Sequence, residues 1–199
     1  PGNVALALQK AGEAGVKLRA EAANCLDLDG MGLGLYDHVF LMGPLYHLTD
    51  GEDRAEAVRQ ALKRLKPGGA FYCSFILDCA AIIYDMKKGP GFLPLDLEEG
   101  TMPLIVDSVL RGEGYAGKSF TTACLVNQRQ IEPFLAPFGL EKLALFGQEG
   151  ILSPNEEQIL SYPEAEQALW IDLAKGLLEV PELLAYAEHA MYIGRKVAS

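Results

Sequence analysis

The sequence lacks the features that mark a membrane-spanning or secreted protein. No uninterrupted apolar run approaches the roughly 20 residues that a membrane-spanning helix needs. No signal peptide is visible, and the four cysteines form no Cys-x-x-Cys pair. We therefore expect no membrane partner, reduced thiols and a cytoplasmic protein. No closely spaced set of oxygen ligands predicts a metal site.

Positive charge is also scarce. The 199 residues include 17 lysines and arginines against 27 aspartates and glutamates, which gives a net charge of −10. An acidic surface repels a nucleic-acid backbone and an anionic membrane alike, so we expect neither as a partner. Half of the residues are hydrophobic. The chain can therefore build one domain with a sizeable core, with room for an inserted subdomain.

The first third of the chain contains a strand–helix–strand pattern. Residues Asp37–Met42 form a short apolar run, which predicts a strand buried on both faces. A helix follows, with Thr49 and Glu52 at the spacing of a capping box, and Pro67-Gly68-Gly69 ends it. Ala70–Leu77 is the second buried strand. This order predicts a βαβ unit, and hence a parallel sheet with a right-handed crossover.

The other elements are predicted from apolar periodicity and from the positions of glycine and proline. Helices are expected over 4–14, 78–88, 102–110, 130–138, 155–160 and 163–179, and strands over 16–23, 119–126, 140–146 and 189–197. The stretch 89–100 holds three glycines and two prolines, which predicts a loop. Trp170 and the leucines around it have helical spacing, which is typical of a core-facing stripe.

The stretch from Tyr36 to Gly69 carries the most specific pattern. It contains Gly43-Pro44-Leu45-Tyr46-His47-Leu48 and closes on Leu65-Lys66-Pro67-Gly68-Gly69. This resembles the fourth to sixth motifs of class I S-adenosylmethionine-dependent methyltransferases, and it is especially similar to a bacterial small-molecule group. The resemblance implies an α/β, Rossmann-like fold with helices on both faces of a mostly parallel sheet and an antiparallel last strand. It also implies S-adenosyl-L-methionine as the cofactor.

The resemblance assigns the cofactor edge to two turns. The turn Ala23–Leu28 looks like the one after the family's third strand, where Asn24 would accept from the adenine amino group and the backbone of Cys25 would face the ring. Ligands of open α/β sheets lie outside the carboxyl ends of the strands, where Gly43 lets the backbone approach without a Cβ. The cofactor-binding candidates are therefore Asn24, Cys25, Leu26, Met42, Gly43 and Pro44.

Part of the family's cofactor site has no counterpart in the sequence. The Gly-rich loop and the acid that holds the ribose would both lie before Pro1. We therefore expect the N-terminal strands to be missing and the 199 residues alone to bind S-adenosylmethionine weakly or not at all. A Rossmann-type nicotinamide-dependent oxidoreductase is an alternative. Its Gly-x-Gly-x-x-Gly would fall in the same missing region, so the stretch Gly43–Leu48 is the better discriminator and favours the methyltransferases.

Two histidines are candidate catalytic bases, because imidazole titrates near neutral pH. His47 follows the cofactor edge, and its alternative role is to cap a loop or anchor a helix. His189 starts the last strand, which the resemblance makes antiparallel, so it would lie with Glu149 at the active edge and could orient a substrate amine or hydroxyl. Its alternative role is a local hydrogen bond. The substrate-binding candidates are Tyr46, His47, Glu149 and His189.

Residues 79–118 are long for a crossover connection and interleave aromatics with glycine and proline. They are interpreted as a lid or substrate insertion, with Met86, Leu93 and Met102 as apolar lining, while 1–78 and 119–199 form the methyltransferase core. The alternative role of this segment is a homodimer surface. The predicted function is methyl transfer to an unidentified small molecule. A non-catalytic, methyltransferase-like binding or assembly module is the other alternative, because fold does not fix function.

Overall fold

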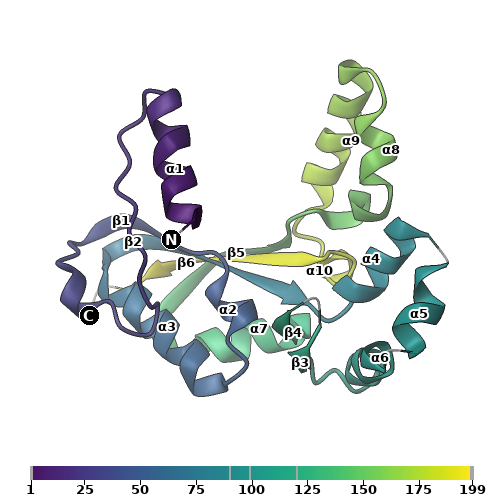
Figure 1. Cartoon of the computed structure of the whole chain (residues 1–199), viewed down its shortest axis with the longest axis horizontal. Coiled ribbons are helices and arrows are strands. Elements are labelled where there is room, and N and C mark those ends of the chain that lie inside the picture. The colour runs from purple at the N-terminus through teal and green to yellow at the C-terminus, as the bar shows by residue number, and fades with distance from the viewer. Residues whose placement is uncertain (1, 90, 99, 120, 198–199) are drawn as a thin grey trace.

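The structure is a computed structural model that describes residues 2–89, 91–98, 100–119 and 121–197. Its centre is one six-stranded sheet in the order β3-β4-β2-β6-β5, with β1 paired to β2 as well (Figure 1). The strands are β1 (Tyr36–Leu41), β2 (Leu65–Leu77), β3 (Tyr115–Lys118), β4 (Thr122–Val126), β5 (Leu140–Gly147) and β6 (His189–Lys196).

The sheet is mixed and not mostly parallel as predicted, because three of its five strand pairings among the described residues are antiparallel. β2 pairs in parallel with β1 along its first part and with β4 at its end. β6 runs antiparallel to both of its neighbours, β2 and β5, so β5 points the same way as β2. β3 is antiparallel to β4. Four strands thus share one direction, and the predicted α/β, Rossmann-like class with an antiparallel last strand is confirmed.

The predicted βαβ unit is present as β1, α3 (Gly51–Lys63) and β2, with the short α2 (Pro44–His47) between β1 and α3. The N-cap of α3 is Asp50 and not Thr49, because the Asp50 side chain accepts from the backbone N–H groups of Glu52 at 2.8 Å and Asp53 at 3.1 Å. A carboxylate cap also suits the positive end of the helix dipole. The cap therefore sits one residue further along the chain than the spacing predicted.

The segment Lys66–Gly69 lies within β2 and does not separate helix from strand. The pairing of β1 with β2 shifts between Tyr36 and His38, so this segment forms an irregularity in the ladder. A Cβ added at Gly69 would lie 2.6 Å from Leu65 Cδ1 and 2.9 Å from a backbone oxygen of β1. Only glycine fits this close approach.

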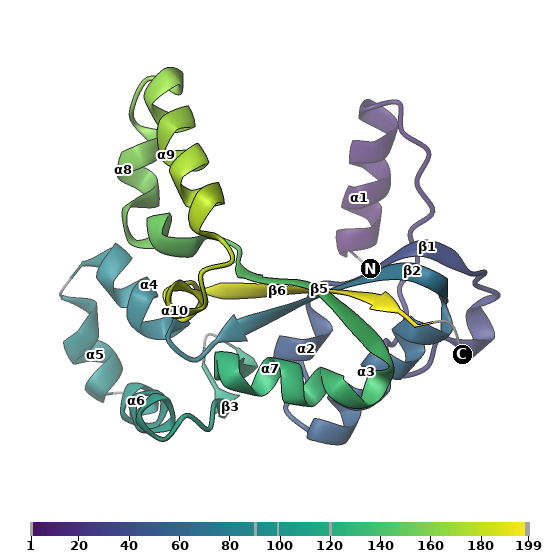
Figure 2. The same ribbon diagram turned by 180° about the vertical axis from the view of Figure 1, so that it is seen from behind.

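The core lies mainly on the face of the sheet that α3 and α7 (Gln128–Leu135) cover (Figure 2). A smaller cluster joins Ile76 and Leu125 to α4 (Ala80–Lys88) and α6 (Thr101–Arg111). α1 (Gly2–Glu13) and α9 (Glu164–Leu177) project from the other face and bury no residue. The expected core role of Trp170 is therefore wrong, since this side chain is 43% exposed.

The remaining helices are short. They are α5 (Phe92–Glu98), α8 (Glu156–Leu160) and α10 (Pro181–Leu184), together with 3-10 helices at Asp29–Met31, Ala136–Phe138 and Gly150–Asn155. None of the helices in the described part of the chain is both long and apolar enough to cross a membrane.

Three local predictions are wrong. Residues 16–23 form no strand. β1 is not buried on both faces, because Phe40 is 62% exposed and stacks on Tyr72 with ring centroids 4.4 Å apart. The expected loop over 89–100 contains α5, whose Pro94 falls in the first turn, where no intrahelical N–H bond is lost.

Leu65→Ala should lower the free energy of unfolding by about 2–5 kcal/mol, because it leaves a cavity at a fully buried position of β2. Urea denaturation followed by circular dichroism measures this. Leu110→Ala on α6 is the matched control, since Leu110 is 81% exposed and the change should stay within about 0.5 kcal/mol. Equal losses in the two variants would contradict the placement of the core.

Candidate active site

A cavity of about 550 Å³ lies at the carboxyl ends of β2 and β4. This is the edge at which open α/β sheets bind their ligands. Apolar side chains from Ile76, Met102 and Ile105 make up much of its wall, and polar and charged side chains border it as well. Such a cavity has the size and the chemistry of a small-molecule site. The lining residues are Ile76, Ala80, Ala81, Tyr84, Asp85, Thr101, Met102, Ile105, Lys118, Ser119, Leu125, Glu188 and His189.

His189 borders this cavity and is paired with Glu149. The Nδ1 of His189 lies 2.6 Å from one carboxylate oxygen of Glu149, and the backbone N–H of His189 donates to the other oxygen at 2.9 Å. His189 begins β6 and Glu149 follows the end of β5, so the antiparallel pairing of these strands brings the two residues together. When Nδ1 of the neutral ring carries the proton that it donates to Glu149, Nε2 is the nitrogen that can accept a second proton.

The pair stabilises opposite charges on its two members. The hydrogen bond to Glu149 raises the pKa of His189 above its ordinary value, although burial opposes this. For Glu149, burial acts to raise the pKa, but the side-chain and backbone hydrogen bonds from His189 outweigh it and the net direction is down. The imidazolium form of His189 is thus stabilised by a carboxylate that stays ionised.

Neighbouring ion pairs fix the start of β6. Lys87 of α4 donates to Glu188 at 2.8 Å and to Glu156 at 3.1 Å. The Ser153 hydroxyl donates to the same Glu188 oxygen at 2.5 Å. Glu188 is therefore held from two segments that are distant in sequence. This limits the movement of the adjacent His189.

Tyr46 connects the cavity to the turn at the end of β1. Its ring centroid lies 6.2 Å from that of His189, and its ring packs against the cluster around Ile76. The turn itself begins at Gly43, whose φ of 131° strongly favours glycine. A Cβ on Gly43 would lie 3.8 Å from the Tyr46 hydroxyl. Gly43, Tyr46, His189 and Glu149 thus form one continuous group.

The other predicted residues lie outside this group. His47 is exposed, does not border the cavity and rests its ring against Tyr46 at 4.9 Å. Met42 is 48% exposed and Pro44 is the first residue of α2. The side-chain oxygen of Asn24 accepts from the Leu26 N–H at 3.1 Å and retains a second lone pair.

Cys25 and Leu26 pack against the main core. Burial raises the pKa of the Cys25 thiol, and the charge of Asp53, in the first turn of α3, adds to this rise.

Several polar residues of the cavity were missed from the sequence. Asp85 is 6% exposed although α4 is otherwise apolar on its inner side. A single acid among apolar residues is the sequence feature that indicates this buried position. Lys118 and Glu188 gave no signal, because only the fold brings them to the cavity. Met102 borders the cavity as expected, whereas Met86 and Leu93 do not. No group of three or more His, Cys, Asp or Glu among the described residues could hold a metal ion.

Comparison with known proteins identifies the fold. No protein-family model and no curated protein matches the sequence. An S-adenosylmethionine-dependent methyltransferase from Clostridium acetobutylicum has a similar structure, with a TM-score of 0.52 and 12% identity over 96% of this chain and 70% of that chain. One from Methanosarcina mazei gives a TM-score of 0.52 and 14% identity over 98% and 78%. The chain has the class I methyltransferase fold.

The fold alone does not decide the reaction. The [4+2]-cyclase SpnF has a TM-score of 0.51 and 18% identity, over 98% of this chain and 63% of that chain. A cyclase and methyltransferases are therefore all similar in structure to this chain. The reaction has to be argued from the site.

Glu149→Gln should lower the pKa of His189, because it removes the carboxylate that stabilises the imidazolium. The contribution of the His189–Glu149 pair to the free energy of unfolding should be fully present below the ordinary histidine pKa. It should be lost as the pH rises through the raised pKa of His189. An NMR titration of the His189 ring protons measures the shift. Glu141→Gln, at an exposed ion pair of β5, is the matched control and should leave the midpoint unchanged. An unchanged midpoint in Glu149→Gln would contradict the pairing.

Proposed function

We propose that this protein transfers a methyl group from S-adenosyl-L-methionine to a hydroxyl or amine of a small molecule, with His189 as the general base. The observation that carries the proposal is the His189–Glu149 pair at 2.6 Å on the wall of the cavity. A paired imidazole next to an apolar pocket is suited to accept the proton of an acceptor group. The methyltransferase fold supports the choice of reaction.

The turn at the end of β1 fits the cofactor. Gly43 has a backbone conformation that places no Cβ between the turn and a ligand, and Pro44 stiffens the turn. The residues that would hold the cofactor are Gly43 and Pro44, with Met42 beside them and the loop Asn24–Leu26 toward the adenine. S-Adenosylmethionine, when bound, supplies an electrophilic methyl group and leaves as a neutral thioether.

The protein's own residues then orient and deprotonate the acceptor. The cavity holds the acceptor in line with the methyl group, which accounts for most of the rate enhancement that such a reaction needs. Nε2 of His189 accepts the acceptor proton as the new bond to carbon forms, and Glu149 stabilises the resulting imidazolium. Tyr46 forms the wall between the cofactor turn and the acceptor cavity.

Residues 79–118 serve as the lid of this site within the proposed function. α4 contributes Ala80, Ala81, Tyr84 and Asp85 to the cavity wall, and α6 contributes Met102 and Ile105. The apolar lining excludes water from the acceptor. The remainder, 1–78 and 119–199, supplies the sheet and the paired His189 and Glu149.

Incubation of the full-length gene product with methyl-tritiated S-adenosylmethionine and a panel of phenols and primary amines should label at least one acceptor. His189→Asn should lower the rate about 100-fold or more, because loss of a general base costs roughly 10²–10⁴ in rate. The wild-type rate should rise with pH through the raised pKa of His189, since only the neutral imidazole accepts a proton. Scintillation counting of the extracted product measures both effects.

The other two histidines are matched controls. His47→Asn and His38→Asn should each change the rate less than about threefold, because neither side chain borders the cavity. A large loss in His47→Asn with none in His189→Asn would reverse the choice of base. Absence of any labelled product, together with binding of NAD⁺ and not of S-adenosylhomocysteine, would instead support an oxidoreductase. Binding of neither would support a non-catalytic module.

A further inference from the structure

A second cavity, of about 290 Å³, lies on the opposite side of the sheet from the acceptor site. Phe75 borders it, whereas Ile76, the next residue of β2, borders the acceptor cavity. Adjacent residues of a strand point to opposite faces, so the sheet separates the two spaces. The second cavity lies between α3, α7 and the β3–β4 hairpin. Its principal walls are Arg54, Phe75, Tyr115, Cys124, Ile131 and Phe134.

Arg54 brings an unusual charge into this cavity. Its Nε is buried and donates no hydrogen bond to any described residue. Its guanidinium carbon lies 5.4 Å from the centroid of the Phe134 ring. No carboxylate among the described residues forms an ion pair with it. A buried donor without an acceptor is costly, so an acceptor from outside the protein would be bound favourably.

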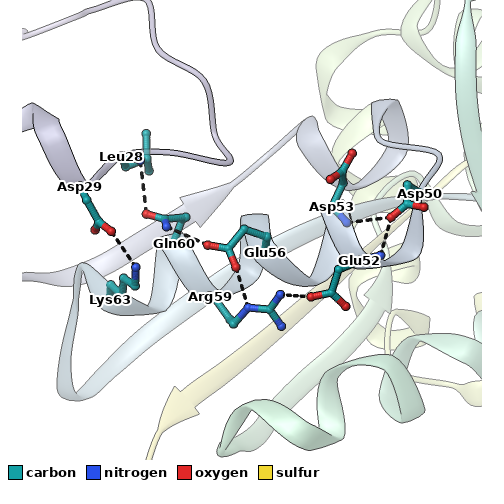
Figure 3. A network of polar contacts seen from close by, with 9 residues as sticks. All are labelled: Leu28, Asp29, Asp50, Glu52, Asp53, Glu56, Arg59, Gln60 and Lys63. Atoms are coloured by element: carbon teal, nitrogen blue, oxygen red, sulfur yellow. Dashed lines mark hydrogen bonds and ion pairs between the residues drawn. The ribbon is translucent and has the colours of Figure 1, made fainter.

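Arg59 on the same helix shows the usual arrangement. Its guanidinium donates to both Glu52 and Glu56 on the exposed side of α3 (Figure 3). The chain carries ten more acidic than basic side chains, so carboxylates are not scarce. Arg54 therefore has no ion pair among the described residues because its position on α3 places it at the cavity, and not because the chain has few carboxylates.

The other polar groups at the cavity wall are already engaged. The Gln130 side chain donates to the backbone oxygen of Glu113 at 2.8 Å and accepts from the Asn127 N–H at 3.1 Å. The Tyr115 hydroxyl donates to a backbone oxygen at 2.7 Å. The Glu113 carboxylate forms an ion pair with Arg111 at the surface. Arg54 remains as the one charged group on the wall whose hydrogen-bonding capacity is open within the described residues.

Aromatic rings complete the walls. The rings of Phe75 and Phe134 meet edge to face with centroids 6.2 Å apart, and Cys124 is 4% exposed. An apolar space with one cation at its wall suits a ligand with a flat apolar body and a single negative charge. Arginine recognises the planar, two-oxygen geometry of a carboxylate particularly well.

We propose that this cavity binds a small aromatic carboxylate, with the carboxylate on Arg54 and the ring against Phe75 and Phe134, which line the cavity. The site is separate from the acceptor cavity and does not depend on the methyl-transfer proposal. It shares only the β4 residue Leu125 with the acceptor cavity.

Phenylacetate and its neutral analogue phenylacetamide are suitable probes, followed by isothermal titration calorimetry and by methyl NMR of Ile131. Phenylacetate should bind saturably and shift the Ile131 signal, and phenylacetamide should bind at least about tenfold more weakly, because only the acid pairs with the guanidinium. Arg54→Met should weaken phenylacetate binding by a similar factor. Equal affinity for the two probes, or no saturable binding of either, would overturn the proposal.

Two further variants keep the test specific. Arg59→Met removes a positive charge from the same helix outside the cavity and should leave phenylacetate binding unchanged. His189→Asn changes the acceptor cavity and should also leave it unchanged. If Arg54→Met fails to fold by circular dichroism, the comparison of the two probes on the wild-type protein decides alone. Loss of binding in His189→Asn would place phenylacetate in the acceptor cavity and contradict the proposal.

Discussion

The insertion of β6 between β2 and β5 is the constraint on which the site depends. Because β6 runs against both neighbours, its first residue lies where they end. His189 therefore meets Glu149, which follows β5, and faces the cavity at the end of β2. An ion pair with Lys87 of α4 and a hydrogen bond from Ser153, in the segment before α8, hold Glu188 at the same strand end. The strand order thus determines where the pair lies.

Much of this arrangement could be predicted. Apolar runs were sufficient to place β1, α3 and β2, although β2 begins before the Pro-Gly-Gly segment, and the resemblance of residues 36–69 implied the antiparallel last strand. Those two expectations together placed His189 and Glu149 at one edge. The structure brings the two residues into hydrogen-bonding contact, while their catalytic role stays a prediction. The roles of the cofactor-binding candidates stay predictions in the same way.

Other features could not be read from the sequence, for physical reasons. Burial of an apolar helix face depends on whether a partner lies against it, so the spacing around Trp170 predicted a core that α9 does not have. An apolar run does not reveal whether other elements cover both faces of a strand, so the exposure of Phe40 could not be predicted. The cavity beside Arg54 arises from α3, α7 and a hairpin that are distant in sequence. No local sequence pattern indicates that these segments lie together.

The central claim is that His189 and Glu149 act as one unit in methyl transfer. A double-mutant cycle on the initial rate, with tritiated S-adenosylmethionine and the best phenol of a panel, tests it directly. Glu149→Gln alone should slow the reaction by about tenfold or more, because the imidazolium loses its partner. In a protein that already carries His189→Asn, the same change should have no further effect. Independent, multiplicative losses from the two substitutions would contradict the account.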